Sequence, residues 1–442
     1  MREMKDSGVE WIEEIPKDWE ISSFKRVFSF DKGLPITKEN LVETGIPVLS
    51  YGQIHSKSNS GIRLSDDLLR YVSEEYLNTN PSSLARRGDI LFADTSEDYE
   101  GIGNCAYIST DTPIFAGYHT IITRPKDIAN PQYLAFLFQT DNWRSQLRGS
   151  ASGIKVFTIS QSMLKEATVI IPSSQTQHRI ADYLNAKCAQ IDRAIARQQE
   201  VIEKLKEYKL SVITEAVTKG LNSDVPMKDS GIKWIGEIPA HWEAIKMKFV
   251  GRFINGYAFP SSDFISFGIR VMKIANIQPM YVSWLDESFV AESEFDRLAS
   301  YRVEQGDLVF ALTRPIINGG IKVAIFEEDE RVLLNQRNAM YKGDKQLTSK
   351  WQYYLMQNTL FVQEFALFID GTGQQPNIST NEIANISIPL PPILEQNSIA
   401  EYLDRKFAKI DGIISQKQSV IHKLTEYKKS LIYEVVTGKK EV

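Results

Sequence analysis

Several common determinants of location and stability are scarce in this chain of 442 residues. It has only two cysteines, Cys105 and Cys188, and they lie far apart, which argues against a disulfide framework and a cysteine zinc site and leaves Cys188 as a core residue. No run approaches about 18 unbroken apolar residues. The charged start MREMKDSGVEWIEEIP lacks the apolar region of a signal peptide. We therefore expect a cytoplasmic protein that neither spans a membrane nor is secreted.

The motifs of common catalytic sites are also missing. There is no phosphate-binding Gly-x-x-x-x-Gly-Lys-Ser/Thr loop, no Gly-x-Gly-x-x-Gly between a strand and a helix, and no Gly-x-Ser-x-Gly elbow. Five histidines are scattered without metal-ligand spacing: His55, His119, His178, His241 and His422. We predict a binding protein with no catalytic residues and no metal ligands. An enzyme with an unrecognised site remains a weaker alternative.

The bulk composition is that of an ordinary globular protein. Hydrophobic residues make up 43% and charged residues 24% of the chain, which excludes intrinsic disorder, and the length predicts two or three domains. The formal net charge of −5 gives no global electrostatic signal for nucleic acid. Evidence for DNA binding must therefore come from another feature.

An internal repeat is the strongest feature of the sequence. MKDSGVEWIEEIPKDWE at residues 4–20 and MKDSGIKWIGEIPAHWE at residues 227–243 are identical at 12 of 17 positions. Residues 180–184 and 204–209 recur 219 positions later as 399–403 and 423–428. Between these matched frames, the inserts 21–157 and 244–376 share little beyond RGDILFA against QGDLVFA. The pattern predicts a pseudo-twofold molecule whose halves fold alike and present different surfaces. The alternative is an old duplication with drifted inserts.

The first half ends in a long amphipathic segment, near 176–218, that has no Pro or Gly, and its apolar stripe is repeated 219 positions later. Apolar residues recur every three or four positions, which predicts two helices of about 43 residues and roughly 65 Å. A stripe of this length requires a partner, so we expect the helices to pack on each other, antiparallel, as a coiled coil. The predicted seam consists of Ile180, Leu184, Ile191, Ile195, Ile202, Leu205, Ile399, Leu403, Phe407, Ile410, Ile414, Ile421 and Leu424. Tyr208 and Tyr427 lie on the same stripe.

The inserts have the pattern of mixed α and β structure. Short apolar runs predict strands at 46–51, 89–93, 120–123, 269–274, 307–311 and 323–326, and one helix per insert at 131–147 and 349–368. Apolar runs that end at proline, 167–171 and 386–388, precede the long helices. Residues 219–226 form a linker in which Gly220 ends the first long helix.

The order, spacing and duplication of these segments resemble the specificity subunit of Type I restriction-modification enzymes. The resemblance rests on the paired MKDSGxxWIxEIPxxWE segments, GTGQQPN at 371–377, IPLPP at 388–392, and Glu395-Gln396 before IAEYL at 399–403. The first half departs from this pattern, with SGIKVF at 152–157 where the second half has the Gln-Gln-Pro run.

The resemblance implies an α+β fold with two pseudo-twofold-related, mixed α/β target recognition domains joined by two long antiparallel helices. We expect the first recognition domain at 1–157, a central conserved region with a long helix at 158–220, the second recognition domain at 221–376 and a C-terminal conserved region with a long helix at 377–442. Each recognition domain would read one half of a bipartite, asymmetric DNA site, and the helices would set the spacer.

The resemblance also implies the partners. Two methyltransferase subunits would dock on the repeated frame and use S-adenosylmethionine, and restriction subunits would use ATP and Mg. No cofactor would bind this chain itself. The rival interpretation is a protein scaffold with two peptide-binding domains on a helical rod.

Charge within the inserts is nearly balanced. Residues 21–155 and residues 244–374 each hold 14 basic and 15 acidic residues, so each insert must sort its charges onto separate faces. Base readout requires polar side chains on loops. Candidates in the first insert are Lys32, Thr37, Lys38, Gln53, His55, Ser96, Tyr118 and His119. Candidates in the second insert are Tyr257, Ser261, Ser262, Asn276, Gln278, Arg314, Gln336 and Arg337.

Overall fold

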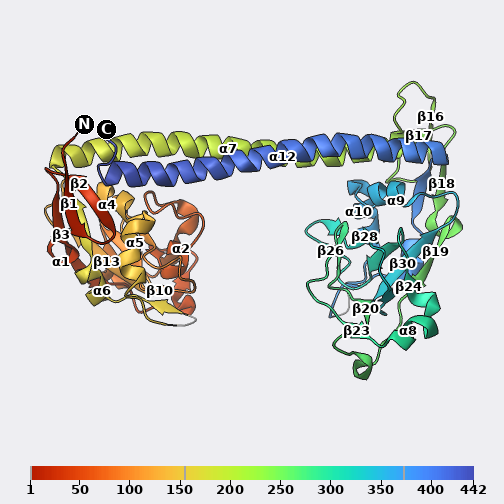
Figure 1. Ribbon diagram of the computed structural model, residues 1–442, viewed down its shortest axis with the longest axis horizontal. Coiled ribbons are helices and arrows are strands. Elements are labelled where there is room, and N and C mark those ends of the chain that lie inside the picture. The colour runs from red at the N-terminus through yellow and green to blue at the C-terminus, as the bar shows by residue number, and fades with distance from the viewer. Residues whose placement is uncertain (1, 154–155, 372–373) are drawn as a thin grey trace. The chain divides into compact units, whose positions relative to one another are not determined.

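The computed structural model describes residues 2–153, 156–371 and 374–442 (Figure 1). The chain divides into two compact units: unit 1 is Met1–Gln198 with Ser419–Val442, and unit 2 is Gln199–Gln418. Each unit combines one insert with the opposite ends of the two long helices. Residues 154–155 and 372–373, which belong to segments used for the resemblance, lie outside the described residues.

Unit 1 contains two sheets built from its insert. The first is antiparallel, in the order β11 (Cys105–Tyr107), β9 (Ile90–Ala93), β13 (Thr120–Pro125), β4 (Phe28–Lys32). All four residues of β9 are buried, because this strand is covered on both faces. The second sheet has the order β5 (Leu41–Val42), β7 (Arg70–Val72), β6 (Ile46–Leu49), β12 (Ile114–Ala116), β8 (Leu84–Ala85), with β12 parallel to β6.

The sheets of unit 2 repeat this arrangement. The strands β19 (Gly251–Asn255), β30 (Asn338–Gly343), β25 (Leu308–Ala311) and β28 (Val323–Ile325) form the first sheet in that order. The second sheet has the order β23 (Phe289–Val290), β20 (Ile269–Met272), β29 (Val332–Leu334), β24 (Arg302–Val303), and β20 and β29 are again a parallel pair. The two inserts, which differ in sequence, therefore share one topology.

The single helix predicted for each insert is wrong, because both are broken in two. Unit 1 has α4 (Pro131–Phe138) and α5 (Asp141–Arg148), and the Thr140 side chain caps α5 by accepting from the Trp143 N–H. Unit 2 has α9 (Ser349–Leu355) and α10 (Thr359–Leu367), capped by Asn358. The capping residue at the same place in both units explains the break, which apolar periodicity alone did not show.

Short elements complete both units. Unit 1 also contains α1 (Phe24–Val27), η1 (Lys38–Asn40), α2 (Tyr51–Ile54), η2 (Asp66–Leu68), α3 (Tyr76–Thr79), η3 (Pro81–Ser83), β10 (Thr95–Ser96), β14 (Phe157–Thr158) and α6 (Gln161–Glu166). Unit 2 also contains η4 (Met247–Phe249), η5 (Ser261–Asp263), β21 (Ile277–Gln278), β22 (Tyr281–Val282), α8 (Glu292–Arg297), η6 (Ala299–Tyr301), β26 (Ile316–Ile317), β27 (Gly320–Ile321) and α11 (Thr380–Ala384).

The repeated frame segments form matching β structures. The MKDSG segments make hairpins, β1 (Met4–Val9) with β2 (Ile12–Pro16) and β16 (Met227–Asp229) with β17 (Glu237–Pro239). The apolar strand before each long helix pairs with the strand that directly precedes the insert: β15 (Thr168–Ile171) with β3 (Glu20–Ser23), and β31 (Ser387–Leu390) with β18 (Glu243–Lys246). Each frame thus closes its insert by joining its first and last strands.

The two long helices are confirmed as α7 (Ser174–Lys219) and α12 (Ile393–Val436). Gly220 ends α7 with a φ of 74°, as predicted. In unit 1 the N-terminal part of α7 shares a core with the C-terminal part of α12, and in unit 2 the C-terminal part of α7 shares a core with the N-terminal part of α12. The helices are therefore antiparallel within each unit.

Burial divides the predicted seam into two groups. Eight members are buried and five are half-buried, and the half-buried ones lie toward the middles of the helices: Ile195, Leu205, Ile414, Ile421 and Leu424. The buried end members also pack into the recognition-domain cores. Tyr208 and Tyr427 leave the stripe and are 45% and 53% exposed.

Candidate nucleic-acid interface

Equivalent loops at one edge of the sheets hold all the candidate residues. In unit 1 these edge loops are 32–40, 50–59, 94–104 and 117–119, which follow β4, β6 and β9 and precede β13. In unit 2 they are 255–263, 273–280, 312–322 and 335–337. Because β13 is antiparallel to β4 and β9, the ends of β4 and β9 meet the start of β13 at the same edge.

Backbone hydrogen bonds establish which positions are equivalent. The Asp94 N–H donates to the His119 carbonyl at 3.1 Å, and the Leu312 N–H donates to the Arg337 carbonyl at 3.0 Å. His119 and Arg337 therefore occupy one place in the fold. The Leu34 N–H donates to Ala116 O, as the Tyr257 N–H donates to Leu334 O, both at 2.8 Å.

Exposure separates the candidates into available and committed side chains. Lys32, Thr37, Lys38, Tyr118, Ser261, Ser262, Arg314, Gln336 and Arg337 are exposed, and Gln53, His55, His119, Tyr257 and Gln278 are partly exposed. For the remaining two, Ser96 and Asn276, the structure corrects the prediction. Ser96 is 4% exposed and donates to Asp98 O at 2.7 Å. Asn276 is fully buried and its amide donates to Ser283 O and Asp286 O, so it shapes its own loop.

A polar network organises the edge loops of unit 1. His119 Nδ1 lies 2.7 Å from Asp94 Oδ1 and 3.1 Å from Thr95 Oγ1. His55 Nε2 lies 2.8 Å from Thr95 O, and Asn104 Nδ2 donates to His55 Nδ1 at 3.0 Å. Two of the four edge loops are thereby fixed to the loop that follows β9. Of these residues, Asp94 and His119 border a groove of about 520 Å³ that is also lined by Lys32 and Tyr118.

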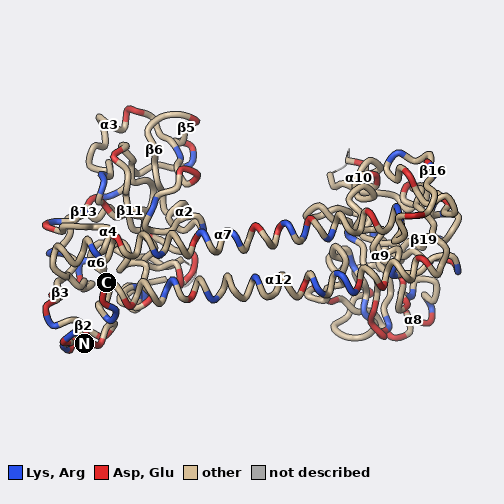
Figure 2. Tube along the Cα trace, turned by 90° about the horizontal axis from the view of Figure 1, so that it is seen from above, with Lys and Arg blue, Asp and Glu red and all other residues tan. Residues whose placement is uncertain are grey.

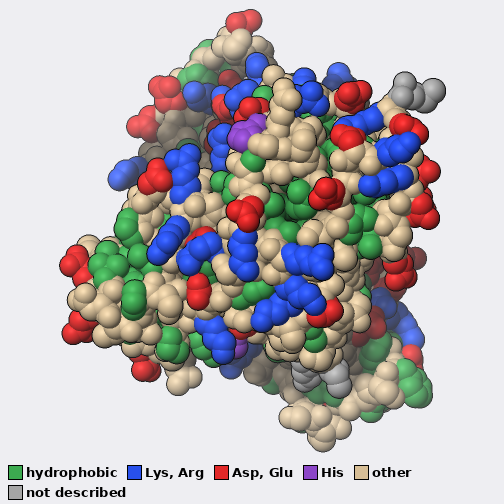
Figure 3. Space-filling model, turned by 90° about the vertical axis from the view of Figure 1, so that its left-hand side faces the viewer, with side chains coloured by type: hydrophobic (Ala, Val, Ile, Leu, Met, Phe, Trp, Pro, Cys, Tyr) green, Lys and Arg blue, Asp and Glu red, His purple; other side chains and the backbone are tan. Residues whose placement is uncertain are grey.

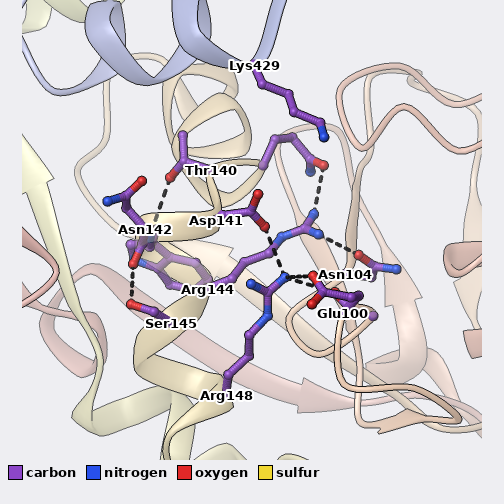
Figure 4. Close-up of polar contacts among 12 residues, drawn as sticks. Glu100, Asn104, Thr140, Asp141, Asn142, Arg144, Ser145, Arg148 and Lys429 are labelled. Atoms are coloured by element: carbon purple, nitrogen blue, oxygen red, sulfur yellow. Dashed lines mark hydrogen bonds and ion pairs between the residues drawn. The ribbon is translucent and has the colours of Figure 1, made fainter. Parts of the chain in front are cut away.

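A half-buried arginine, Arg144, connects this network to α5 (Figure 4). Arg144 donates to Asn104 Oδ1 at 2.7 Å, to Gln139 Oε1 at 2.9 Å and to Phe138 O at 2.9 Å. Burial lowers the pKa of the Arg144 guanidinium from its ordinary value. The neighbouring Arg148 donates to Asp141 Oδ1 and to Glu100 O, both at 3.0 Å. Helix α5 thus positions the 94–104 loop.

In unit 2 the edge loops carry two arginines, Arg314 and Arg337. The other arginines of this insert, except Arg252, form ion pairs: Arg270 with Glu287 and Glu330, Arg297 with Glu294, Arg302 with Asp296, and Arg331 with Glu292. Arg314 and Arg337, on the edge loops, have no carboxylate partner among the described residues. Arg314 also adopts a φ of 47°, a left-handed conformation that non-glycine residues seldom hold and that is typical of functional loops.

A buried lysine lies beneath this loop. Lys322 is 6% exposed, and its ammonium group donates to Ile274 O. Burial, and then the nearby positive charge of Arg314, lower its pKa from the ordinary value. Lys322 replaces Asn104 of unit 1, because the two residues accept equivalent backbone hydrogen bonds from Ala311 and Ala93. Exposed Lys32 and Lys38 in unit 1 and Arg314 and Arg337 in unit 2 thus place cations on the edge loops, although neither insert has net positive charge. Basic and acidic residues are interspersed along the chain in both units (Figure 2).

Further basic residues lie away from the edge loops. Lysine and arginine side chains gather on the face of unit 1 that bears β3 and α1 (Figure 3). In unit 2 the half-buried Lys406 lies 5.1 Å from the ring of Tyr208 and 5.3 Å from that of Tyr402. The equivalent residues 219 positions earlier or later are Lys187, Tyr427 and Tyr183, and Lys187 lies 5.9 Å from the Tyr183 ring. We call these two sets the helix patches.

The described residues contain no group of His, Cys, Asp or Glu side chains that could hold a metal ion. None of the helices in the described ranges has the length and apolarity needed to cross a membrane.

Comparison with known proteins agrees with this architecture. Residues 16–207 and 239–423 match the family model described as Type I restriction modification DNA specificity domain. The Type I restriction enzyme MjaVIII specificity subunit of Methanocaldococcus jannaschii is 28% identical over 382 residues, covering 84% of this chain and 85% of the relative. The Type I restriction enzyme EcoKI specificity subunit of Escherichia coli K12 is 22% identical, and the alignment covers 96% of this chain and 89% of the relative.

Solved structures show the same fold. A chain from a structure describing complex assembly and conformational transition of the type I R-M system has a TM-score of 0.70 at 17% identity, with 96% of this chain and 98% of that chain covered. The HsdS subunit from Thermoanaerobacter tengcongensis has a TM-score of 0.53 at 17% identity, with the same coverage.

Fold, duplicated frame and paired edge loops define a two-domain DNA-recognition protein. The chain belongs to the Type I restriction-modification specificity subunit family, whose model matches both halves. It is a non-catalytic recognition component, and partner subunits perform catalysis. A peptide-binding scaffold is not favoured.

Sequence reasoning missed several residues that shape the edge loops. Four residues that were not predicted as site residues connect or support the candidates: Asp94, Thr95, Asn104 and Lys322. Asp94 directly follows RGDILFA, the segment that the two inserts share, and this position could have marked it as a site residue. Nothing in the local sequence marks Lys322 as buried.

Proposed function

We propose that each unit reads one half of a split, asymmetric double-stranded DNA sequence through its edge loops. The observation that carries the proposal is the equivalence of these loops: one backbone framework presents His119 and Tyr118 in unit 1 and Arg337 and Gln336 in unit 2. Polar side chains on exposed loops can reach base edges in the major groove. Different side chains on the same framework give different half-sites.

The partners follow from the duplication. Two identical methyltransferase subunits dock on the helices and flanking frame segments, with one helix patch serving each copy. These partners supply S-adenosylmethionine chemistry, and restriction subunits supply ATP- and Mg-dependent cleavage. The complex works in the cytoplasm. Because the inserts have no net positive charge, the partners also supply phosphate contacts, and the isolated chain binds DNA weakly.

The helices set the length of the unread spacer. Helix α7 has 46 residues, which at 1.5 Å per residue corresponds to about 69 Å.

An insert exchange tests the division of labour. Replacing residues 21–157 with the insert of a related subunit, co-expressed with the methyltransferase, should change one half of the methylated sequence and leave the other half and the spacer intact. Mobility shift with the assembled complex and methylation mapping provide the measurements. A change in both half-sites contradicts the modular division, and the absence of any sequence-specific shift by the wild-type complex contradicts DNA recognition.

Mass measurement tests the docking. The wild-type chain should bind two methyltransferase copies, whereas Tyr208→Ala should favour binding of one. A wild-type complex that stays one-to-one under saturating partner contradicts the duplicated docking surface.

A further inference from the structure

Opposite hydrogen-bonding groups occupy one equivalent position in the two units. His119 and Arg337 each directly precede the residue that starts the central strand β13 or β30, and each accepts the same backbone hydrogen bond from the loop after β9 or β25. This position is therefore the place where the two reading surfaces can be compared atom by atom.

Neighbouring groups fix the position of the proton on the His119 ring. Asp94 Oδ1, 2.7 Å from His119 Nδ1, is a carboxylate oxygen and can only accept. The Thr95 hydroxyl, 3.1 Å from the same nitrogen, already donates to Asp94 Oδ1 at 2.8 Å. Nδ1 must therefore carry the hydrogen, and Nε2 of the neutral ring is left with a lone pair that accepts.

The accepting nitrogen is available to a ligand. His119 Nε2 has no hydrogen-bond partner within the described ranges, and the side chain is 37% exposed beside the groove lined by Lys32 and Tyr118. The Tyr118 and Tyr51 rings lie edge-on to the imidazole, at centroid distances of 4.0 and 5.5 Å. The ring is thus held in one orientation by Asp94 and by two aromatic neighbours before any ligand arrives.

Arg337 presents the reverse polarity. Its guanidinium has five N–H donors and no acceptor, and the side chain is exposed without a carboxylate partner in the described part of unit 2. Arg314, on the adjacent loop after β25, likewise has no carboxylate partner among the residues that the structure describes. The other arginines of the insert, apart from Arg252, form ion pairs. Arg337 therefore remains available to a bidentate acceptor.

We propose that His119 specifies one base of the first half-site and Arg337 the corresponding base of the second, one as a hydrogen-bond acceptor and the other as a donor. This proposal rests on the DNA-reading function proposed above. His119 Nε2 accepts from an exocyclic amino group, the N6 amino group of adenine or the N4 amino group of cytosine. Arg337 donates to N7 and O6 of guanine. The half-site read by unit 2 then contains a G·C pair at the position that faces Arg337, whereas the corresponding base faced by unit 1 carries an amino group in the major groove.

Reciprocal substitutions test the assignment in the complete complex. His119→Arg should replace the amino-bearing base of the first half-site with guanine, and Arg337→His should replace guanine of the second half-site with adenine or cytosine. Asp94→Asn supplies an amide N–H that can face His119 Nδ1, so the alternative tautomer forms and discrimination at this one position relaxes. We expect about ten- to hundredfold changes in preference between the bases concerned. Methylation mapping and competition binding with single-base variants measure them.

Each variant contains its own folding control, because the half-site read by the untouched unit should keep its sequence and affinity. Lys126→Ala, at an exposed residue that follows β13 at the end of the strand opposite the edge loops, should leave both half-sites unchanged. A His119→Arg complex that methylates the original first half-site with wild-type discrimination overturns the assignment of His119, and the same outcome with Arg337→His overturns that of Arg337. These results differ from failure of the proposed function, in which the wild-type complex itself shows no bipartite specificity.

Discussion

The edge loops of units 1 and 2 share equivalent backbone hydrogen bonds but differ in chemistry. In unit 1, Asp94, Thr95 and His119 form a connected network, and the neutral, half-buried side chain of Asn104 adjoins it through His55. In unit 2 the residue equivalent to Asn104 is the buried Lys322, and the exposed positions carry Arg314 and Arg337. The difference shows that the framework determines where side chains project, whereas the insert alone determines charge and hydrogen-bond polarity.

A second pair of equivalent contacts shows the same separation at the junction between each insert and its long helix. In unit 1, Gln132 of α4 and Asn185 of α7 exchange two amide hydrogen bonds of 3.2 and 2.8 Å. In unit 2, Lys350 of α9 and Asp404 of α12 form an ion pair at 2.8 Å. Asn185 and Asp404 are 219 positions apart, so the repeat keeps the contact and changes its chemistry.

The largest effect is expected from lengthening both long helices, which tests whether the difference between the units lies in the loops alone. Inserting four residues after Gln198 and four after Lys417, the same step of the repeat, adds about one turn or 6 Å to each helix, against about 3.4 Å per base pair. Methylation mapping should show a spacer longer by one or two base pairs with both half-site sequences unchanged. The added turn also rotates the units and is expected to weaken binding. An active complex that retains the original spacer contradicts the ruler.

A smaller, one-sided effect is expected from Arg144→Met. Loss of the guanidinium leaves acceptors on Asn104, Gln139 and Phe138 without a donor, which should destabilise unit 1 by about 2–4 kcal/mol. Freed Asn104 no longer holds His55, so affinity for the first half-site should fall about tenfold.

The matched control is Val362→Met, since Val362 is the equivalent residue of α10. Competition binding with DNA altered in one half-site separates the two contributions. Equal weakening of both half-sites by Arg144→Met would argue against a local role in the edge loops.

The sequence was sufficient for the features that repeat or have a strong period. The duplicated frames and the long helices follow from identity at 12 of 17 positions and from apolar spacing. The breaks at Thr140 and Asn358 were missed because a side-chain cap overrides an apolar pattern. Ser96 shows the limit for sites: exposed and buried serines have the same sequence signal, and only its hydrogen bond to Asp98 reveals the difference.

The smallest expected effect concerns acid stability, where the ion pair of unit 2 and the amide pair of unit 1 should differ. Burial raises the pKa of Asp404, but hydrogen bonds from Lys350 and the Tyr354 hydroxyl outweigh it and hold the pKa below the ordinary value of 3.8. A carboxyl with a lowered folded-state pKa stabilises fully above its unfolded pKa and loses that contribution as pH falls through the folded value. Unit 2 should therefore lose stability from Asp404 below about pH 4, whereas the amides Gln132 and Asn185 do not titrate in this range.

Asp404→Asn isolates this contribution, because it gives unit 2 the same side chain as Asn185 of unit 1. The Lys350 and Asp404 side chains are 67% and 40% exposed, so solvent screening limits the pair to below about 1 kcal/mol. Hydrogen exchange of the complete chain at pH 5 and pH 3 reports each unit separately. The difference between wild type and Asp404→Asn should be confined to unit 2 and should shrink at pH 3, which lies below the ordinary pKa of 3.8 for this carboxyl. A difference that persists unchanged at pH 3 would mean that packing around Tyr354, and not charge, carries the contribution of this contact.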